Sequence, residues 1–179
     1  MSSDFESLNI LLRKKKKLVP TNCSEAAVKN ILLMLEELPK ELRLIAARFD
    51  ERSSLEPIIE GKRSLRDTLL HLLNIEGLNY TTIFPAFLLD KPTIYPLHAE
   101  RDLRKLNLFS DFSFEGLLET FCLERRKTLN FLRSLEMQDW TKQMIKSGKA
   151  REETIYSRAR ELAMHDFVHV QTLKFQLNI

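Results

Sequence analysis

The chain has 179 residues, a formal net charge of +3 and a hydrophobic content of 44%. This length fits one domain with a hydrophobic core, and the composition excludes disorder over the whole chain. The two cysteines, Cys23 and Cys122, are too few for a disulfide scaffold and too widely spaced for a thiolate zinc site. We therefore expect reduced thiols in a cytoplasmic protein, with neither a membrane-spanning segment nor a signal peptide.

The positive charge comes from one short run, Arg13 to Lys17, which reads RKKKK. Removing its five charges leaves 23 basic against 25 acidic side chains, so the rest of the chain carries a net charge of −2. We interpret residues 1–23 as a basic, solvated extension before a single bundle domain at 24–179. One alternative is a short basic amphipathic segment that contacts nucleic acid or an anionic membrane. Because the run has no interleaved aromatic residues, nucleic acid is not the expected partner.

The first predicted helix covers about residues 24–49, with Ser24 as a candidate N-cap. Its apolar residues follow the spacing of a bundle helix, with Val28, Leu35, Leu42 and Phe49 separated by sevens and Ile31, Leu38 and Ile45 between them. Pro39 lies inside this pattern, and we expect it to kink or divide the helix, since proline removes a helical hydrogen bond.

Three more amphipathic helices are predicted at about 64–84, 114–135 and 154–177, with Ser64 as a candidate N-cap. Residues 50–63 and the proline-broken residues 85–112 form irregular connections. The chain contains no Asn-Gly or Asp-Gly pair, which two-residue β-hairpins favour, so no hairpin is expected. The predicted fold is all-α, a four-helix bundle with irregular connections.

Histidines in two of these helices form a candidate metal site. His165 and His169 are one helical turn apart, so both imidazoles can reach one ion. This spacing alone is weakly specific, and two histidines bonded to water or backbone at a helix margin are the simpler alternative. A third histidine, His71, lies on the 64–84 helix and could face them in a bundle. Three neutral imidazoles would hold a divalent ion and leave open positions for water or substrate.

Three charged residues lie within apolar stripes, namely Glu76, Arg125 and Asp166. A charge in such a stripe is costly unless it has a partner. We expect Arg125 to pair with Glu76 or Asp166 near the histidines, and the alternative is that Arg125 extends to solvent at a helix edge. The fourth histidine, His98, is interpreted as a solvated loop residue.

Several segments together resemble the DinB-like, or YfiT-like, superfamily of four-helix metalloenzymes. They are Gly61–Leu72 followed by Glu76, then Pro92–Pro96, Phe121–Leu135, Gln138–Thr141 and the closing HD-x-x-H-x-Q pattern at Met164–Gln171. The resemblance covers about residues 25–178, and the order and spacing of the segments make it more specific than any single motif. Arg63 departs from it, because many members have tryptophan at this place.

The resemblance implies that His71, His165 and His169 bind nickel, zinc or iron, with water completing the coordination. It implies a small-molecule substrate, which in some members is a low-molecular-weight thiol, and a homodimer. A thiol or water activated by the metal would then attack an electrophile, as in an S-transferase or a hydrolase. Glu76, Asp67 and Asp166 are candidates to orient ligands or move protons, and Arg125 could hold an anionic substrate group.

Two other functions stay open from the sequence. One is a bundle that has lost catalysis and acts as a stress-related binding or scaffold protein. The other is an adaptor that contacts nucleic acid or a membrane surface through residues 13–17.

Overall fold

The computed structural model describes residues 2–148 and 152–179. Its seven α-helices are α1 (Ser2–Leu18), α2 (Glu25–Ala46), α3 (Glu51–Leu55), α4 (Leu65–Gly77), α5 (Ile83–Leu88), α6 (Phe114–Ser134) and α7 (Ile155–Leu177). Short 3-10 helices are η1 (Leu78–Thr81), η2 (Leu103–Leu106) and η3 (Asp139–Thr141). Among the described residues, no helix is both long and apolar enough to cross a membrane.

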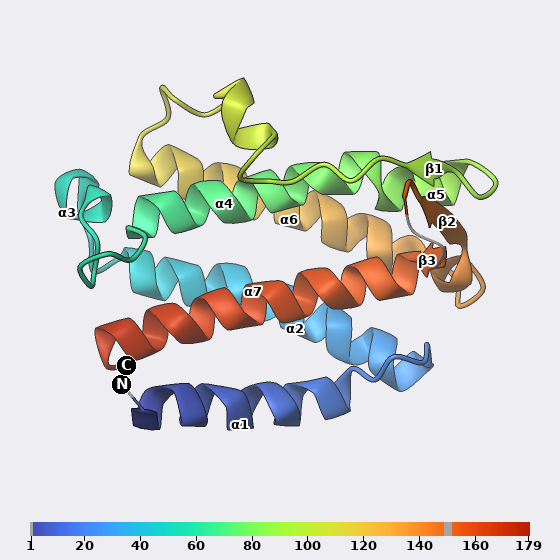
Figure 1. Cartoon of the computed structure of the whole chain (residues 1–179), viewed down its shortest axis with the longest axis horizontal. Helices are drawn as coiled ribbons and strands as arrows, with labels where there is room; N and C mark the ends of the chain where they lie inside the picture. The colour runs from blue at the N-terminus through green and yellow to red at the C-terminus, as the bar shows by residue number, and fades with distance from the viewer. Residues whose placement is uncertain (1, 149–151) are drawn as a thin grey trace.

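Helices α2, α4, α6 and α7 form a four-helix bundle, so the predicted fold class is confirmed (Figure 1). Helix α4 packs against α6 and α7, and α2 packs against the same two helices from the other side. Each of the four begins with a hydroxyl side chain that accepts a backbone N–H three residues later, at Ser24, Ser64, Ser113 and Thr154. These caps satisfy N–H groups that would otherwise lack a partner, and two of them were predicted.

Two predicted helices differ from the structure. The helix expected at 64–84 ends at Gly77, and α5 begins only after a break at Thr82, whose φ of −129° and ψ of −79° are not helical. Pro85 follows in the first turn of α5, where its missing N–H does little harm. Helix α2 runs through Pro39 without division. The proline nevertheless leaves the carbonyl of Leu35 without its usual helical donor.

A small three-stranded sheet caps one end of the bundle (Figure 1). Strand β2 (Gln143–Lys146) lies between β1 (Thr93–Ile94), which is parallel to it, and β3 (Glu152–Thr154), which is antiparallel. The expectation of no hairpin was therefore wrong. The connection from β2 to β3 is longer than a two-residue turn and contains Gly148 with a φ of 79°. A left-handed glycine in a longer loop does not need the Asn-Gly or Asp-Gly pair.

Most of the predicted basic extension is helical. Helix α1 packs against α7 and lies along the bundle (Figure 1). The chain that follows α1 is anchored by α7, because Arg160 donates to the Val19 carbonyl at 2.6 Å and the Tyr156 hydroxyl donates to the Pro20 carbonyl at 2.5 Å. Val19 itself is fully buried. The division of the chain at residue 23 into extension and domain stays a prediction.

The hydrophobic core consists of two clusters. On α6, one cluster includes Phe121 and Cys122 and the other includes Leu129 and Leu132, with the buried Arg125 between them. Helix α7 repeats this arrangement, because apolar residues up to Ala163 belong to one cluster and those from Val170 to the other. A polar layer therefore crosses the middle of the bundle, and this layer contains the candidate site.

Candidate metal centre

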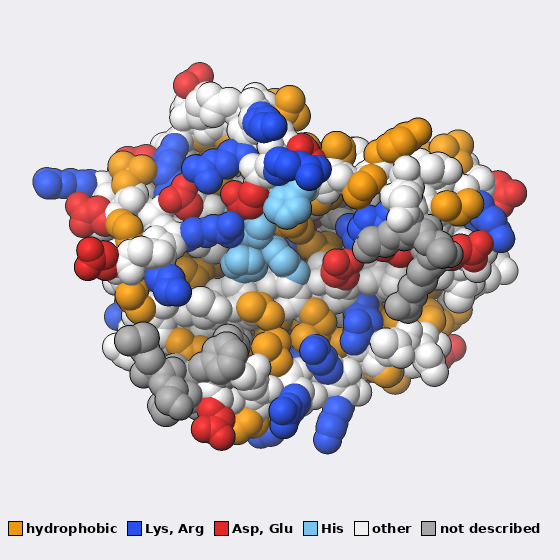
Figure 2. Space-filling model, viewed as in Figure 1, with side chains coloured by type: hydrophobic (Ala, Val, Ile, Leu, Met, Phe, Trp, Pro, Cys, Tyr) orange, Lys and Arg blue, Asp and Glu red, His pale blue; other side chains and the backbone are white. Residues whose placement is uncertain are grey.

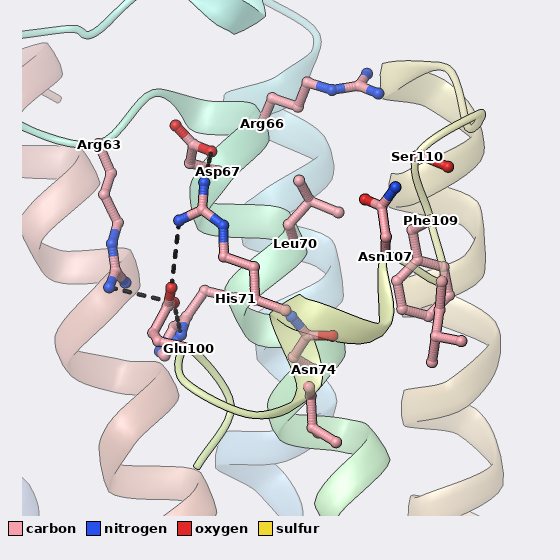
Figure 3. Close-up of a pocket in the computed structure, with 13 residues that line it drawn as sticks. Arg63, Arg66, Asp67, Leu70, His71, Asn74, Glu100, Asn107, Phe109 and Ser110 are labelled. Carbon is pink, nitrogen blue, oxygen red and sulfur yellow. Dashed lines mark ion pairs between the residues drawn. The ribbon is translucent and has the colours of Figure 1, made fainter.

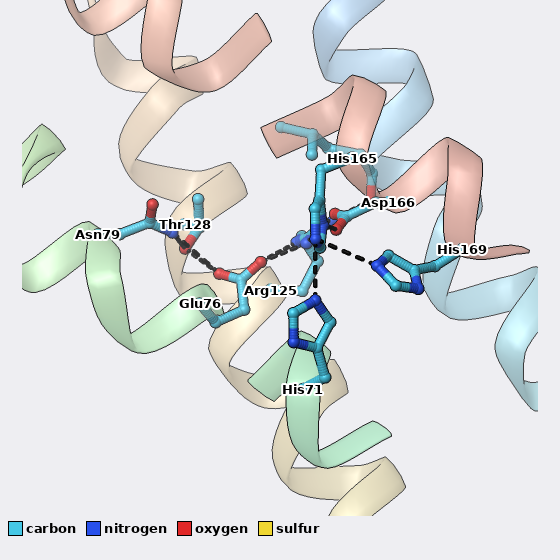
Figure 4. A network of polar contacts seen from close by, with 9 residues as sticks. His71, Glu76, Asn79, Arg125, Thr128, His165, Asp166 and His169 are labelled. Carbon is cyan, nitrogen blue, oxygen red and sulfur yellow. Dashed lines mark hydrogen bonds and ion pairs between the residues drawn. The ribbon is translucent and has the colours of Figure 1, made fainter. Parts of the chain in front are cut away.

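The structure brings the three predicted histidines together (Figure 4). His71 projects from α4, and His165 and His169 project from adjacent turns of α7. The Nε2 atom of His165 lies 2.9 Å from Nε2 of His71 and 3.2 Å from Nε2 of His169. One nitrogen from each residue lies within 4.8 Å of the other two. The sequence did not determine whether His71 faces the other two histidines. In the structure, α4 is oriented so that His71 points towards α7.

This donor set fits a divalent cation. Metal–nitrogen bonds of about 2.0–2.1 Å place two ligand nitrogens about 2.9 Å apart at a right angle and about 3.3 Å apart in a tetrahedron. The two shortest nitrogen distances in the cluster lie close to this range. Imidazoles are intermediate ligands that suit zinc, nickel and iron. The residues present thus match a three-histidine site, a ligand set that would leave coordination positions for water or substrate.

The pKa values of two histidines favour the neutral form that binds metals. Burial, reinforced by the charges of the other two histidines, lowers the pKa of His169 to about 3. Burial also lowers the pKa of His71, with further contributions from His165 and Arg63. Because a metal ligand must offer a lone pair, these shifts keep the nitrogens available at neutral pH.

A buried ion cluster lies behind the histidines, built around Arg125 on α6 (Figure 4). Arg125 is fully buried, and its guanidinium contacts both Glu76 and Asp166, with Nη2 2.6 Å from Oδ2 of Asp166. The sequence offered one partner or the other, and Arg125 uses both. The other carboxylate oxygen of Asp166 lies 3.1 Å from Nδ1 of His165. Arg125 is thus linked through Asp166 to a candidate ligand.

The remaining polar atoms of this cluster also have partners. The second oxygen of Glu76 accepts hydrogen bonds from Thr128 Oγ1 at 2.7 Å and from Asn79 Nδ2 at 3.1 Å. Nη1 of Arg125 donates to the Leu35 carbonyl at 3.4 Å. This is the carbonyl that Pro39 leaves free in α2, so the proline supplies an acceptor to the cluster.

This buried cluster contains one guanidinium group and two carboxylates. The pKa values of the two carboxylates are shifted in opposite directions. Burial raises the pKa of Glu76, against the opposing effect of Arg125. Burial acts in the same sense on Asp166, but Arg125 and His165 outweigh it and lower the pKa of Asp166. Asp166 therefore carries the charge that faces His165. Because Arg125 is buried, it is placed to orient Asp166 and not to contact an anionic group of a substrate.

Sequence reasoning missed Glu100, which lies beside the third histidine. Its Oε1 is 2.5 Å from Nδ1 of His71, although the two atoms are not aligned as a hydrogen bond. Glu100 lies between β1 and η2, in the connection that was predicted only as irregular. Helical periodicity does not indicate where such a segment folds back, so no signal in the sequence pointed to this residue. His98, two residues earlier, is exposed as predicted.

A cavity of about 360 Å³ adjoins the cluster, and His71 forms part of its wall (Figure 3). Figure 2 shows histidine side chains grouped near the middle of one face, with Lys and Arg side chains beside them. Asp67, at the start of α4, also lines the cavity, whereas Glu76, Arg125 and Asp166 do not. The site therefore has an accessible side with charged walls and an inaccessible side with the ion cluster.

No family model and no curated protein matches the sequence. Among solved structures, YfiT from Bacillus subtilis superposes with a TM-score of 0.74 over 89% of this chain and 92% of that one, at 16% sequence identity. This chain has the YfiT fold. The YfiT structure is described as that of a probable metal-dependent hydrolase with an unusual four-helix bundle topology. The resemblance inferred from the sequence is thus confirmed for the fold.

Proposed function

We propose that this chain is a metal-dependent enzyme acting on a small molecule, with His71, His165 and His169 as ligands of a divalent nickel, zinc or iron ion. The observation that supports this most directly is the meeting of three imidazole nitrogens from two helices, of which one residue, His71, lines a cavity. The description of YfiT as a probable metal-dependent hydrolase supports the same reading. A cavity of this size is in the range of small-molecule sites.

The bound ion would act as a Lewis acid. It would lower the pKa of a bound water or thiol, so that this group could lose its proton near neutral pH. The protein side chains prepare the site for this chemistry. Burial keeps His71 and His169 neutral. Oδ1 of Asp166 lies 3.1 Å from Nδ1 of His165, and Nε2 of that ring is directed at the other histidines, so this contact would orient the ring for metal binding through Nε2. Arg125 holds Asp166 in this orientation as a positioning residue.

The nucleophile is proposed to come from solution, as water in a hydrolase or as a low-molecular-weight thiol in an S-transferase. Neither cysteine of the chain lines the cavity. Burial raises the pKa of both Cys23 and Cys122, which disfavours the reactive thiolate. The thiol co-substrate and a homodimer are predictions drawn from the family resemblance.

The proposal is tested by loading the metal-free protein with zinc, nickel or ferrous iron and assaying two reactions in parallel. One is hydrolysis of a panel of small amides and esters, and the other is transfer of a small thiol to an electrophile. We expect turnover in at least one reaction, dependent on the metal and abolished by His165→Ala. A protein that binds the metal and turns over no substrate in either panel would favour the non-catalytic scaffold.

A further inference from the structure

The cavity beside His71 is lined by three arginines, Arg63, Arg66 and Arg104, and by two carboxylates, Asp67 and Glu100. Arg66 is already committed to the fold. Its Nη1 lies 2.9 Å from Glu51 Oε1, and its Nη2 donates to the Phe112 carbonyl at 2.5 Å. The other two arginines are held differently, and they are the basis of the inference.

Arg63 and Arg104 contact carboxylates that line the cavity, at nitrogen–oxygen distances of 3.2 to 3.8 Å. Arg63 Nη2 lies 3.2 Å from Oε1 of Glu100, and Arg104 lies 3.6 Å from Oε2 of Glu100 and 3.8 Å from Oδ1 of Asp67. Their side chains are 44% and 67% exposed, respectively. Ion pairs of this kind contribute little to stability, so both guanidinium groups can exchange one carboxylate for another at small cost.

Glu100 shows which kind of group fits between them. Its Oε1 faces Arg63 and Nδ1 of His71 (Figure 3), and its Oε2 faces Arg104. The planar fork of an arginine matches carboxylate and phosphate oxygens, and two arginines can hold such a group from two sides.

We propose that Arg63 and Arg104 form a subsite for an oxyanion group of the substrate, a carboxylate or a phosphate, and that Glu100 occupies this place until the substrate displaces it. The class of substrate is then a small anion whose charged group lies beside His71 while its reacting group faces the three histidines. Only this second step depends on the proposed function, because the subsite itself needs no metal.

The first test measures anion binding to the full-length, metal-free protein by calorimetry at constant ionic strength, with inorganic phosphate in one series and acetate in the other. We expect the double variant Arg63→Ala/Arg104→Ala to lose at least about tenfold in affinity for the anion that binds, the loss of charge-assisted hydrogen bonds. The matched control is Arg101→Ala, because Arg101 is 67% exposed, pairs with Asp102 and does not line the cavity. Equal affinities in the wild type, the double variant and the control would overturn the proposal.

The second test is Glu100→Gln, which keeps the shape of the side chain and removes its charge. If Glu100 occupies the subsite, this variant binds the anion several-fold more tightly than the wild type. Unchanged or weaker binding would contradict the displacement of Glu100. Comparing phosphate with acetate in the same variants identifies which oxyanion the arginines prefer.

Zinc binding, measured in the same proteins, separates this inference from the proposed function. If anion binding depends on Arg63 and Arg104 while the wild type binds no zinc, the anion subsite is supported and the proposed metal-dependent function is contradicted. If zinc binds at the histidines and the affinity for both anions is unchanged in the arginine variant, only the anion subsite is contradicted.

Discussion

Arg125 is the residue on which the interior of the bundle depends. Its guanidinium is fully buried and links Glu76 on α4 to Asp166 on α7. A buried guanidinium is stable only when carboxylates neutralise its charge. Removing one member of the cluster would leave the remaining charges buried without a partner of opposite sign. The same contacts orient His165, so the stability of the bundle and the geometry of the candidate site share one group of side chains.

Replacing Arg125 with methionine should lower the free energy of unfolding by about 3–5 kcal/mol, because Glu76 and Asp166 would face each other without a counter-charge. Urea unfolding followed by circular dichroism measures the change. The control is Arg126→Met on the exposed side of α6, for which a change within about 0.5 kcal/mol is expected. Equal stabilities of the two variants would show that the cluster is not needed for folding.

Asp166→Asn should weaken zinc binding about 10- to 100-fold, as expected when the partner of a ligating histidine is lost. Glu76→Gln is the matched control, because Glu76 contacts Arg125 but no histidine. Competition with a zinc indicator measures both affinities. If the two variants lose affinity equally, general disturbance of the bundle explains the loss, and Asp166 has no specific role in orienting His165.

At the scale of elements, the start of α4 fixes the position of His71. Ser64 Oγ accepts the backbone N–H of Asp67 at 3.0 Å, and Ser64 is almost fully buried. From this cap the helix runs two turns to His71, so the cap sets the direction from which the histidine approaches α7.

Ser64→Ala should therefore lower the free energy of unfolding by about 1 kcal/mol, the usual loss for an N-cap. Ser134→Ala, at the exposed C-terminal end of α6, serves as the control with little expected effect. Denaturant midpoints of the two variants give the comparison. A loss at Ser134 as large as at Ser64 would count against a special role of the cap.

The elements also show what the sequence could and could not predict. The long helices and their caps were predictable, because periodic apolar residues and cap residues are local signals. The His71–His165–His169 cluster was expected from the helix spacing and the family resemblance. The break at Thr82, the small sheet and Glu100 were not predictable, since each depends on how an irregular segment folds back onto the bundle.

At the scale of the whole molecule, a polar layer separates the two apolar clusters of the core. The ion cluster is buried on the inner side of this layer, and His71 lines the cavity on the other side. At its centre, the bundle therefore contains charged groups in fixed positions instead of continuous apolar packing. Such an arrangement is typical of sites built from the facing helices of a bundle.

The metal-free protein should lose stability as the pH falls from 7 to 5. In the folded chain the pKa values of His71 and His169 lie below their ordinary value of 6.5, the latter at about 3. The unfolded chain therefore binds more protons in this window, so the stability present above about pH 6.5 is lost progressively as the pH decreases. Urea midpoints at several pH values measure the slope. His169→Gln should show a smaller slope, and an identical slope would contradict the lowered pKa of His169.

The central claim is that three histidines bind one metal ion. The most direct measurement is the metal content of full-length protein purified without a histidine tag, determined by mass spectrometry of the elements. We expect about one equivalent of a divalent transition metal per chain, lost in His71→Ala, because two remaining imidazoles on one helix hold such an ion poorly. A content below a few tenths of an equivalent, unchanged by His71→Ala, would contradict it.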